Sequence, residues 1–294
     1  MTDNPNSQKR ERRALDLAAV WSRGIALLRD NFQLIAILAG VFVLLPNAAL
    51  QFALPSSEDI QGPFEALMDP NASQAMQEKA TLALGEMFLP IMGYAAPTVV
   101  IAHIGYAGIV ALIGRARPTV GEALAQAVRV ILPLIIAIII AVLAIYAVLF
   151  VVQLVLTPLG PNVAAFLGAV LGFLAWFYLT ARLYLTLPVM VIEWELNPVK
   201  ALLRSWRLTS AARSNVFGFW MMLAVAWFVT LMIQSAVSAL LSSIPGPGPT
   251  ADLIQGLFGG LFSMVWGSIY CAMGVSLHAT LKGPDAEEIA ADFE

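Results

Sequence analysis

Long apolar stretches separated by short polar segments dominate the chain. Between residues 130 and 181 there is no charged side chain, a run too long for one element of a soluble core and long enough for two bilayer crossings of about 20 residues each. The turn-forming sequence at residues 157–162 divides it. The pattern predicts transmembrane helices at residues 32–54, 87–114, 130–156, 163–192, 214–241 and 253–281. We therefore expect an all-α, polytopic integral membrane protein.

Composition supports the same class. Of 294 residues, 60% are hydrophobic and 12% are charged, and the mean hydropathy is +0.81. Soluble domains are about half apolar and about a quarter charged. We expect a six-helix membrane domain at residues 32–281, preceded by a tail and amphipathic helix at residues 1–31 and followed by an acidic tail at residues 282–294.

The positions of the charges predict the orientation. Basic residues precede the first span and lie between spans two and three and between spans four and five, whereas residues 55–85 carry one lysine, Lys79, among several carboxylates. Lys and Arg are enriched in cytoplasmic loops. Both termini are therefore predicted to be cytoplasmic, and residues 55–85 to form an acidic outer segment with a short helix at residues 72–84.

Three amphipathic segments, at residues 16–21, 123–128 and 201–206, each precede a span. Their spacing fits three copies of an interface helix followed by a hairpin, with an insertion in the first copy. The alternative is that apolar helices resemble one another by chance. Thr119 and Glu122 have capping-box spacing, and Asn197 followed by Pro198 is typical of a helix start.

The segment after Pro198 has two kinds of side chain at helical spacing. Val199, Leu202, Leu203 and Trp206 fall on one predicted face, and Lys200, Arg204 and Arg207 fall on another. This pattern is typical of a helix in the headgroup layer of a membrane. We expect the three basic residues, together with Arg182, to contact anionic lipid.

Arg182 is a charged residue inside a predicted span. Counted along one continuous helix, it lies about 15 Å before the cytoplasmic end, close to mid-membrane. A charge there is costly without a partner. The hypothesis is that Arg182 pairs with a lipid phosphate or with Glu193 of a neighbouring copy. The alternative is that it hydrogen-bonds backbone carbonyls or extends toward the cytoplasmic surface.

Catalytic and metal-binding patterns are missing from the sequence. There is no Gly-x-Ser-x-Gly turn, no His-Glu-x-x-His and no glycine-rich loop before a lysine. His103, His278 and Cys271 have no neighbours at metal-ligand spacing. We expect neither an enzyme nor a cofactor, and no nucleic-acid binding. The Gly-x-x-x-Gly pairs at Gly168 and Gly256 predict close helix packing, within one chain or between two.

A sequence motif extends over the fourth span and the segment after it. It consists of Arg182, Pro188 and Glu193, then Ala-Leu-x-x-Ser-Trp-x-Leu from Ala201 with Ser205 and Trp206 inside it. The motif resembles the membrane domain that some bacterial glycerophosphoryl diester phosphodiesterases carry, and stand-alone six-helix proteins related to it. The resemblance implies a membrane module, and since only a short acidic tail follows residue 281, we expect no catalytic domain.

Taken together, these patterns predict a non-catalytic bacterial inner-membrane protein that interacts with lipids or with other membrane proteins. The alternative is a transporter of a lipid-like or small anionic solute, with Arg182 in its pathway. A membrane-enzyme subunit that needs a separate catalytic partner is a third possibility. The sequence does not determine the oligomeric state.

Overall fold

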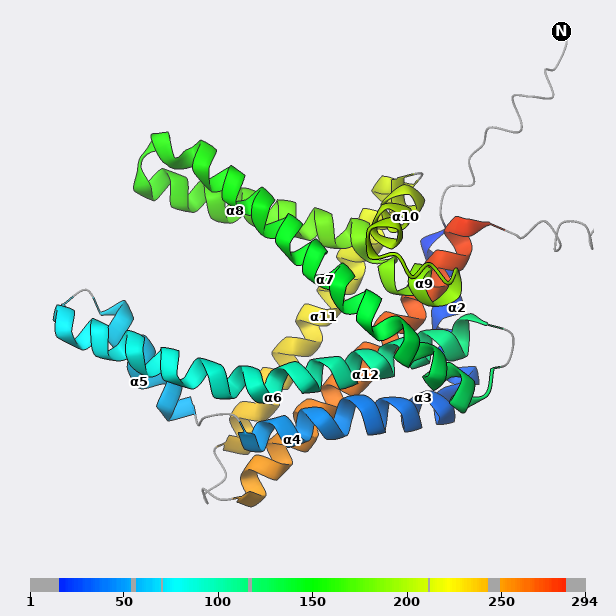
Figure 1. The fold of residues 1–294 in the computed structure, drawn as a ribbon, viewed down its shortest axis with the longest axis horizontal. Coiled ribbons are helices and arrows are strands. Elements are labelled where there is room, and N and C mark those ends of the chain that lie inside the picture. Colours follow the sequence, from blue (N-terminus) through cyan, green and yellow to red (C-terminus); the bar gives the residue numbers. More distant parts are fainter. Residues whose placement is uncertain are drawn as a thin grey trace, which may run out of the picture. The chain divides into compact units, whose positions relative to one another are not determined.

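The structure is a computed structural model that describes residues 16–53, 57–69, 71–115, 118–210, 212–242 and 249–283. Every regular element in this part of the chain is a helix (Figure 1). Six helical segments are long and apolar enough to cross a membrane: Phe32–Leu50, Gln74–Gly114, Val120–Leu159, Asn162–Ile192, Arg213–Leu241 and Leu253–Lys282. The predicted all-α class with six helices able to span a membrane is confirmed for the described residues. The predicted tails outside residues 16–283 lie beyond the described residues.

The chain forms two compact units. One contains the described parts of Met1–Ile35, Tyr106–Leu231 and Trp266–Glu294, and the other contains Ala36–Gly105 and Met232–Val265. The long helices α6 (Gln74–Gly114), α11 (Arg213–Ser242) and α12 (Pro249–Lys282) contribute to both. The first unit holds every candidate functional residue named above.

The second unit begins within α3 (Phe32–Ala39), which widens into a π-helical turn at Gly40–Leu44 before α4 (Leu45–Ala53). Pro46 explains the turn, because proline has no N–H and its ring collides with the carbonyl four residues earlier. The Asn47 Nδ2 atom donates to the Val43 carbonyl over 2.7 Å. The side chain of Asn47 thus hydrogen-bonds the backbone where the helix is irregular.

The predicted outer segment is more helical than expected. It contains α5 (Ser57–Met68), and the separate helix predicted at residues 72–84 is wrong, because α6 runs without interruption from Gln74 to Gly114. Only Gly85 and Glu86 separate the two predicted helices, and one glycine weakens a helix by only about 1 kcal/mol. Neither Pro90 nor Pro97 ends α6.

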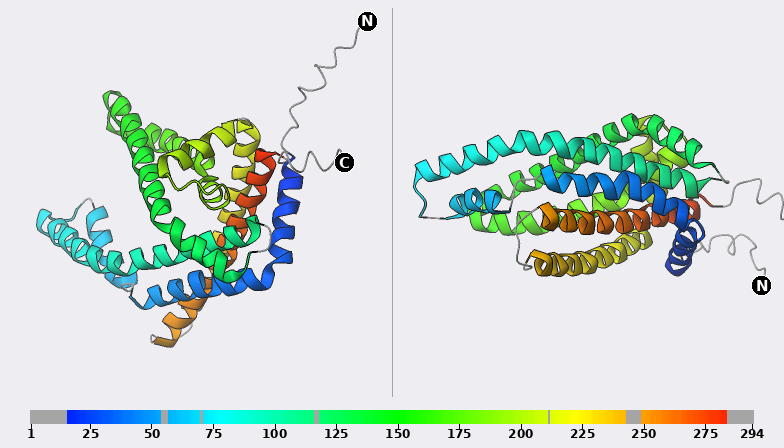
Figure 2. Two further views of the ribbon diagram at one scale, coloured as in Figure 1. Left: turned by 45° about the vertical axis from the view of Figure 1, so that its right-hand side comes forward. Right: turned by 90° about the horizontal axis from the view of Figure 1, so that it is seen from below.

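In the first unit, α2 (Leu17–Asp30) is the predicted amphipathic helix near the N-terminus. Its start is fixed by Asp16, whose side chain accepts from the Ala18 and Ala19 amides. The Ser276 hydroxyl of α12 donates to the Val20 carbonyl over 2.7 Å, which fastens the two helices together. Figure 2 shows α2 crossing the last turns of α12 at a steep angle in its right-hand view.

Helices α7 (Val120–Leu156) and α8 (Pro161–Leu183) run side by side as a hairpin (Figures 1 and 2). The predicted turn between them is confirmed, and Gly160 is required there because its φ of 90° is unfavourable for a residue with a side chain. Gly168 and Gly172 face Gln153 and Leu149 of α7. This Gly-x-x-x-Gly pair therefore packs within the chain.

Two predicted elements of this unit are divided differently in the structure. Residues 123–128 form part of the first turns of α7, which continues from its capping box at Thr119 through Pro133 into the span. The span predicted at residues 163–192 agrees with the candidate span Asn162–Ile192, but it contains a turn: α8 ends at Leu183, and α9 (Thr186–Ile192) follows. Helix α10 (Pro198–Ser210) then packs against α7, α8 and α9.

Candidate functional site

The break between α8 and α9 is the first feature of the candidate site. Pro188 has no N–H for the Tyr184 carbonyl, and its ring would collide with that carbonyl in a continuous helix. Leu185, the residue before α9, accordingly leaves helical geometry with a ψ of 5°. Pro188 is buried and faces Gly274 of α12. The proline of the motif therefore has a structural role, which is to end α8 just after Arg182.

Side chains of α10 hydrogen-bond the carbonyl that this break leaves available. A helix end has up to four carbonyls without intrahelical partners. The Ser205 hydroxyl donates to the Arg182 carbonyl over 2.9 Å, and the Thr209 hydroxyl reaches the same oxygen at 3.3 Å. Both side chains are fully buried. The broken end of α8 is thus joined to α10 through hydroxyl groups.

The Arg182 side chain turns toward α10 and is 4% exposed. Its Nη2 donates to the Trp206 carbonyl over 3.0 Å and to the Ser210 hydroxyl. The Trp206 ring centre lies 4.4 Å from Cζ, a cation–π contact. Among the described residues, Nε and Nη1 have no hydrogen-bond partner. The guanidinium is held by a π face and neutral oxygens.

These contacts include one of the kinds predicted for Arg182, which is a hydrogen bond to a backbone carbonyl. In the part of the chain that the structure describes, the guanidinium forms no ion pair with a carboxylate, and the carbonyl-bonded alternative describes its contacts. The mid-membrane estimate assumed one helix as far as residue 192. That assumption is wrong, because the chain turns at Leu185 and α10 folds back beside Arg182.

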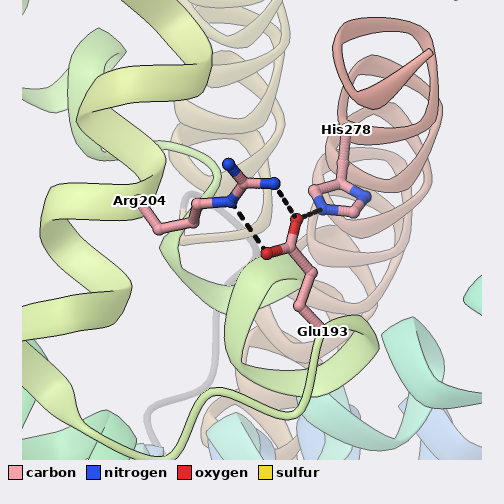
Figure 3. Close-up of polar contacts among 3 residues, drawn as sticks. All are labelled: Glu193, Arg204 and His278. Atoms are coloured by element: carbon pink, nitrogen blue, oxygen red, sulfur yellow. Dashed lines mark hydrogen bonds and ion pairs between the residues drawn. The ribbon is translucent and has the colours of Figure 1, made fainter.

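Glu193 forms a second polar cluster with Arg204 and His278 (Figure 3). Arg204 donates from Nε to Oε2 over 2.9 Å and from Nη2 to Oε1 over 3.3 Å. The His278 Nε2 atom lies 2.9 Å from Oε1. Burial raises the pKa of Glu193, but the hydrogen bonds and charges of Arg204 and His278 outweigh it, so the pKa is lowered overall. The three residues connect the end of α9, α10 and α12.

Helix α10 has three distinct faces. Successive residues turn by about 100°, which places Val199, Leu203 and Trp206 within about 60° of one another. These three side chains are exposed, whereas Leu202 is buried in the protein, so the single predicted apolar face is in fact two. The basic residues Lys200, Arg204 and Arg207 lie within about 60° on the next face, with Lys200 and Arg207 exposed.

An open cleft of about 840 Å³ lies where α6, α7 and α9 end or begin. Its lining includes Arg115, Glu122, Gln126, Arg129 and Trp194. None of the site residues predicted from the sequence lines it. Gln126 is a polar residue among the apolar residues of α7, and its side chain is buried. This polar position is the one sign of the cleft in the sequence.

The structure brings six of the eight predicted site residues together. Arg182, Pro188, Ser205 and Trp206 meet at the helix break, and Glu193 pairs with Arg204 beside it. Lys200 and Arg207 lie on the exposed basic face of α10. His278, Thr209 and Ser210 belong to the same contacts but had no sequence signal, since His278 is 85 positions from Glu193.

Metal and cofactor chemistry have no identifiable centre in the described residues. No three His, Cys, Asp or Glu side chains in residues 16–283, apart from the undescribed gaps, are placed to hold a metal ion. Cys271 is buried and reduced. The polar clusters at Arg182 and Glu193 consist of side chains that already engage one another, which is an arrangement that joins helices.

Comparison of the chain with protein-family models, with curated proteins and with solved structures found no match. The resemblance to the membrane domain of glycerophosphoryl diester phosphodiesterases therefore stays a prediction that rests on the motif from Arg182 to Trp206.

Proposed function

We propose that this chain is a non-catalytic protein of the bacterial inner membrane that binds anionic phospholipid through α10. The observation that carries the proposal is the division of α10 into a buried face, an exposed apolar face and an exposed basic face. A helix docked on a bundle by one face and presenting apolar and basic side chains on adjacent faces suits the boundary between acyl chains and headgroups.

The energetic argument concerns the two exposed basic residues, Lys200 and Arg207. Each Lys or Arg near an anionic membrane surface contributes about 1 kcal/mol, so the pair contributes about 2 kcal/mol if both reach headgroups. Arg204 contributes less, because Glu193 already neutralises it. Val199, Leu203 and Trp206, on the adjacent exposed face, add the burial of apolar side chains in the membrane.

The proposal includes the orientation of the chain. The distribution of Lys and Arg supports cytoplasmic termini and a position of α10 at the inner leaflet, where anionic lipids are found. The transporter alternative has less support. It requires Arg182 in a pathway, whereas Arg182 donates to Trp206 and Ser210 under an indole ring. Other membrane proteins are further candidate partners through the exposed apolar helix faces.

Spin labels on α10 test this proposal. In a Cys271→Ser background, single labels at Lys200 and Leu203 are introduced into the full chain in vesicles that contain phosphatidylglycerol. We expect the Leu203 label at acyl-chain depth and the Lys200 label at headgroup depth. An impermeant reductant should reach the Lys200 label only in inverted vesicles.

The matched charge variants are Lys200→Gln/Arg207→Gln and, as a control on α2, Arg23→Gln/Arg29→Gln. Only the first should reduce co-purifying phosphatidylglycerol, by roughly tenfold or more. Equal and fully aqueous accessibility of both labels, or equal lipid loss in both variants, would contradict the proposal.

A further inference from the structure

The cleft between α6, α7 and α9 contains two arginines that the α10 proposal does not use. Arg115 directly follows the last residue of α6, and Arg129 lies on the third turn of α7. Both side chains are exposed to the cleft region. Each guanidinium offers a planar fork of N–H donors suited to the oxygens of a phosphate.

The wall of the cleft opposite α7 is held in an unusual conformation. Trp194 has a φ of 60°, a left-handed conformation that L-residues with large side chains rarely adopt. The Arg115 Cζ atom lies 5.6 Å from the centre of the Trp194 ring. Such strain is typical of functional sites, and here it places an indole beside an arginine.

Hydrogen bonds join two lining residues of the cleft to the backbone of α9. Arg115 Nη2 donates to the Val191 carbonyl over 3.3 Å, and the buried Gln126 amide donates to the same oxygen. Arg115, which follows α6, and Gln126 of α7 are therefore tied to one carbonyl of α9. A site whose walls are fixed in this way loses little conformational entropy when a ligand binds.

The net charge of the described lining residues is positive. Among them Glu122 is the carboxylate, and its Oε2 atom is engaged with the Thr119 amide at 2.8 Å and the Thr119 hydroxyl at 2.9 Å in the capping box of α7. Arg115 and Arg129 exceed it by one charge, since two positive groups stand against one negative group. The cleft thus favours an anion.

From this geometry we infer that the cleft is a binding site for a phosphate ester group, with Arg115 and Arg129 as its donors and Trp194 as a wall. The volume of about 840 Å³ lies within the range of ligand sites. The cleft opens where the candidate spans Gln74–Gly114 and Asn162–Ile192 end. A lipid headgroup and a soluble phosphate ester share the chemistry that this site recognises.

The site is independent of the proposed α10 surface. None of the α10 residues lines the cleft, and none of the cleft residues lies on α10. A lipid bound on α10 can therefore be lost while the cleft keeps its ligand, and the reverse also holds. Variants in one surface serve as controls for the other.

The test uses the full chain in detergent and four double variants. Arg115→Gln/Arg129→Gln removes both donors, and Arg115→Lys/Arg129→Lys keeps the charge but removes the fork. Arg23→Gln/Arg29→Gln and Lys200→Gln/Arg207→Gln are the matched controls. Native mass spectrometry measures retention of phosphatidylglycerol against a phosphate-free glucosyl diacylglycerol, and thermal unfolding measures the effect of inorganic phosphate against chloride at equal ionic strength.

We expect the glutamine variant of the cleft to bind its phosphate ligand about tenfold more weakly, the lysine variant to be impaired to a lesser degree, and the α2 control to match the parent. Lys200→Gln/Arg207→Gln should match the parent in stabilisation by inorganic phosphate, while it loses the phosphatidylglycerol that is bound on α10. Preferential retention of phosphatidylglycerol identifies a lipid headgroup as the source, and stabilisation by inorganic phosphate in delipidated protein identifies a soluble ester. If the glutamine variant matches the parent in both measurements, or if the α2 control is equally impaired, the inference is overturned.

Discussion

Two regions of the first unit differ in the side chains that they expose and bury. The outer arm of the α7–α8 hairpin, residues 136–178, exposes many large apolar side chains: Ile139, Leu143, Tyr146, Phe150, Val151, Leu154, Val155, Phe166 and Phe173. The corner at residues 182–210 instead buries polar groups, among them Arg182, Ser205 and Thr209. In water, so many exposed apolar side chains on the outer arm would be unfavourable. At the corner, a buried polar atom without a hydrogen-bond partner would be unfavourable.

The difference indicates the surroundings that each region requires. Apart from its turn at residues 157–160, the outer arm keeps its backbone bonds inside helices and leaves its side chains to an apolar surrounding, which is how helices cross a bilayer. The corner interrupts a helix, so its available carbonyl needs hydroxyl donors from α10. Three experiments test this comparison, and the largest expected effect comes first.

A charge placed on the outer arm should have the largest effect. Leu143 is 63% exposed on α7, near the middle of the candidate span. We expect Leu143→Arg to reduce stability or insertion by about 2.5 to 3.5 kcal/mol, because the guanidinium would face hydrocarbon. The loss of stability is measured by unfolding in lipid nanodiscs, and the loss of insertion by the fraction of the protein that inserts into the membrane.

The control for this charge is Leu203→Arg on α10. It should change stability far less, since an arginine there reaches headgroups along its flexible stem. Equal losses in the two variants would show that the arm and the α10 face do not differ in their surroundings.

Removal of the hydroxyls at the corner should have an intermediate effect. The double variant Ser205→Ala/Thr209→Val leaves the buried Arg182 carbonyl without its two donors from α10. A buried acceptor without a partner costs about 1 to 3 kcal/mol. We expect a loss near the middle of that range in the free energy of unfolding, with α10 released first in hydrogen exchange.

Thr230→Val is the control for the hydroxyl variant. The Thr230 hydroxyl donates to Ala226 and Trp227 carbonyls of its own helix, where the helix ladder already supplies donors. The Thr230→Val variant should therefore change the free energy of unfolding only slightly. A loss as large in Thr230→Val as in the double variant would argue against the hydroxyl bridge to Arg182.

The smallest expected effect is the pH-dependent contribution of Glu193 to the free energy of unfolding. Since the folded-state pKa of Glu193 is lowered, its stabilising contribution is complete above the pKa of the unfolded carboxyl, about 4.3. It is lost as the pH falls through the lowered folded value. The facing charges are Arg204 and His278. We expect no more than about 1 kcal/mol, because the Arg204 side chain is 43% exposed.

Thermal unfolding of the parent and Glu193→Gln from about pH 7 to about pH 3 measures this contribution. The parent should be the more stable at neutral pH, and the difference should shrink toward acid because the glutamine has no carboxyl to protonate. Parallel curves across the whole range would mean that the Glu193 carboxylate contributes nothing to stability.

Local signals in the sequence determined much of the fold. The charge-free runs predicted six helices able to cross a membrane, and the described part of the chain contains six. The capping box at Thr119 and Glu122 is formed, and Asn197 accepts from the Lys200 amide over 3.0 Å. These features depend on residues three or four positions apart, or on one continuous apolar run, so the sequence contains all that they require.

Tertiary structure alone decided how the helices are divided and how polar groups are paired. Pro188 is visible in the sequence, but a membrane helix often tolerates a proline, and the break there is stabilised by Ser205 and Thr209 on another helix. His278 meets Glu193 across 85 positions, and Trp194 adopts its left-handed backbone beside Arg115. Such contacts depend on how separate helices pack, which no periodicity within a single helix encodes.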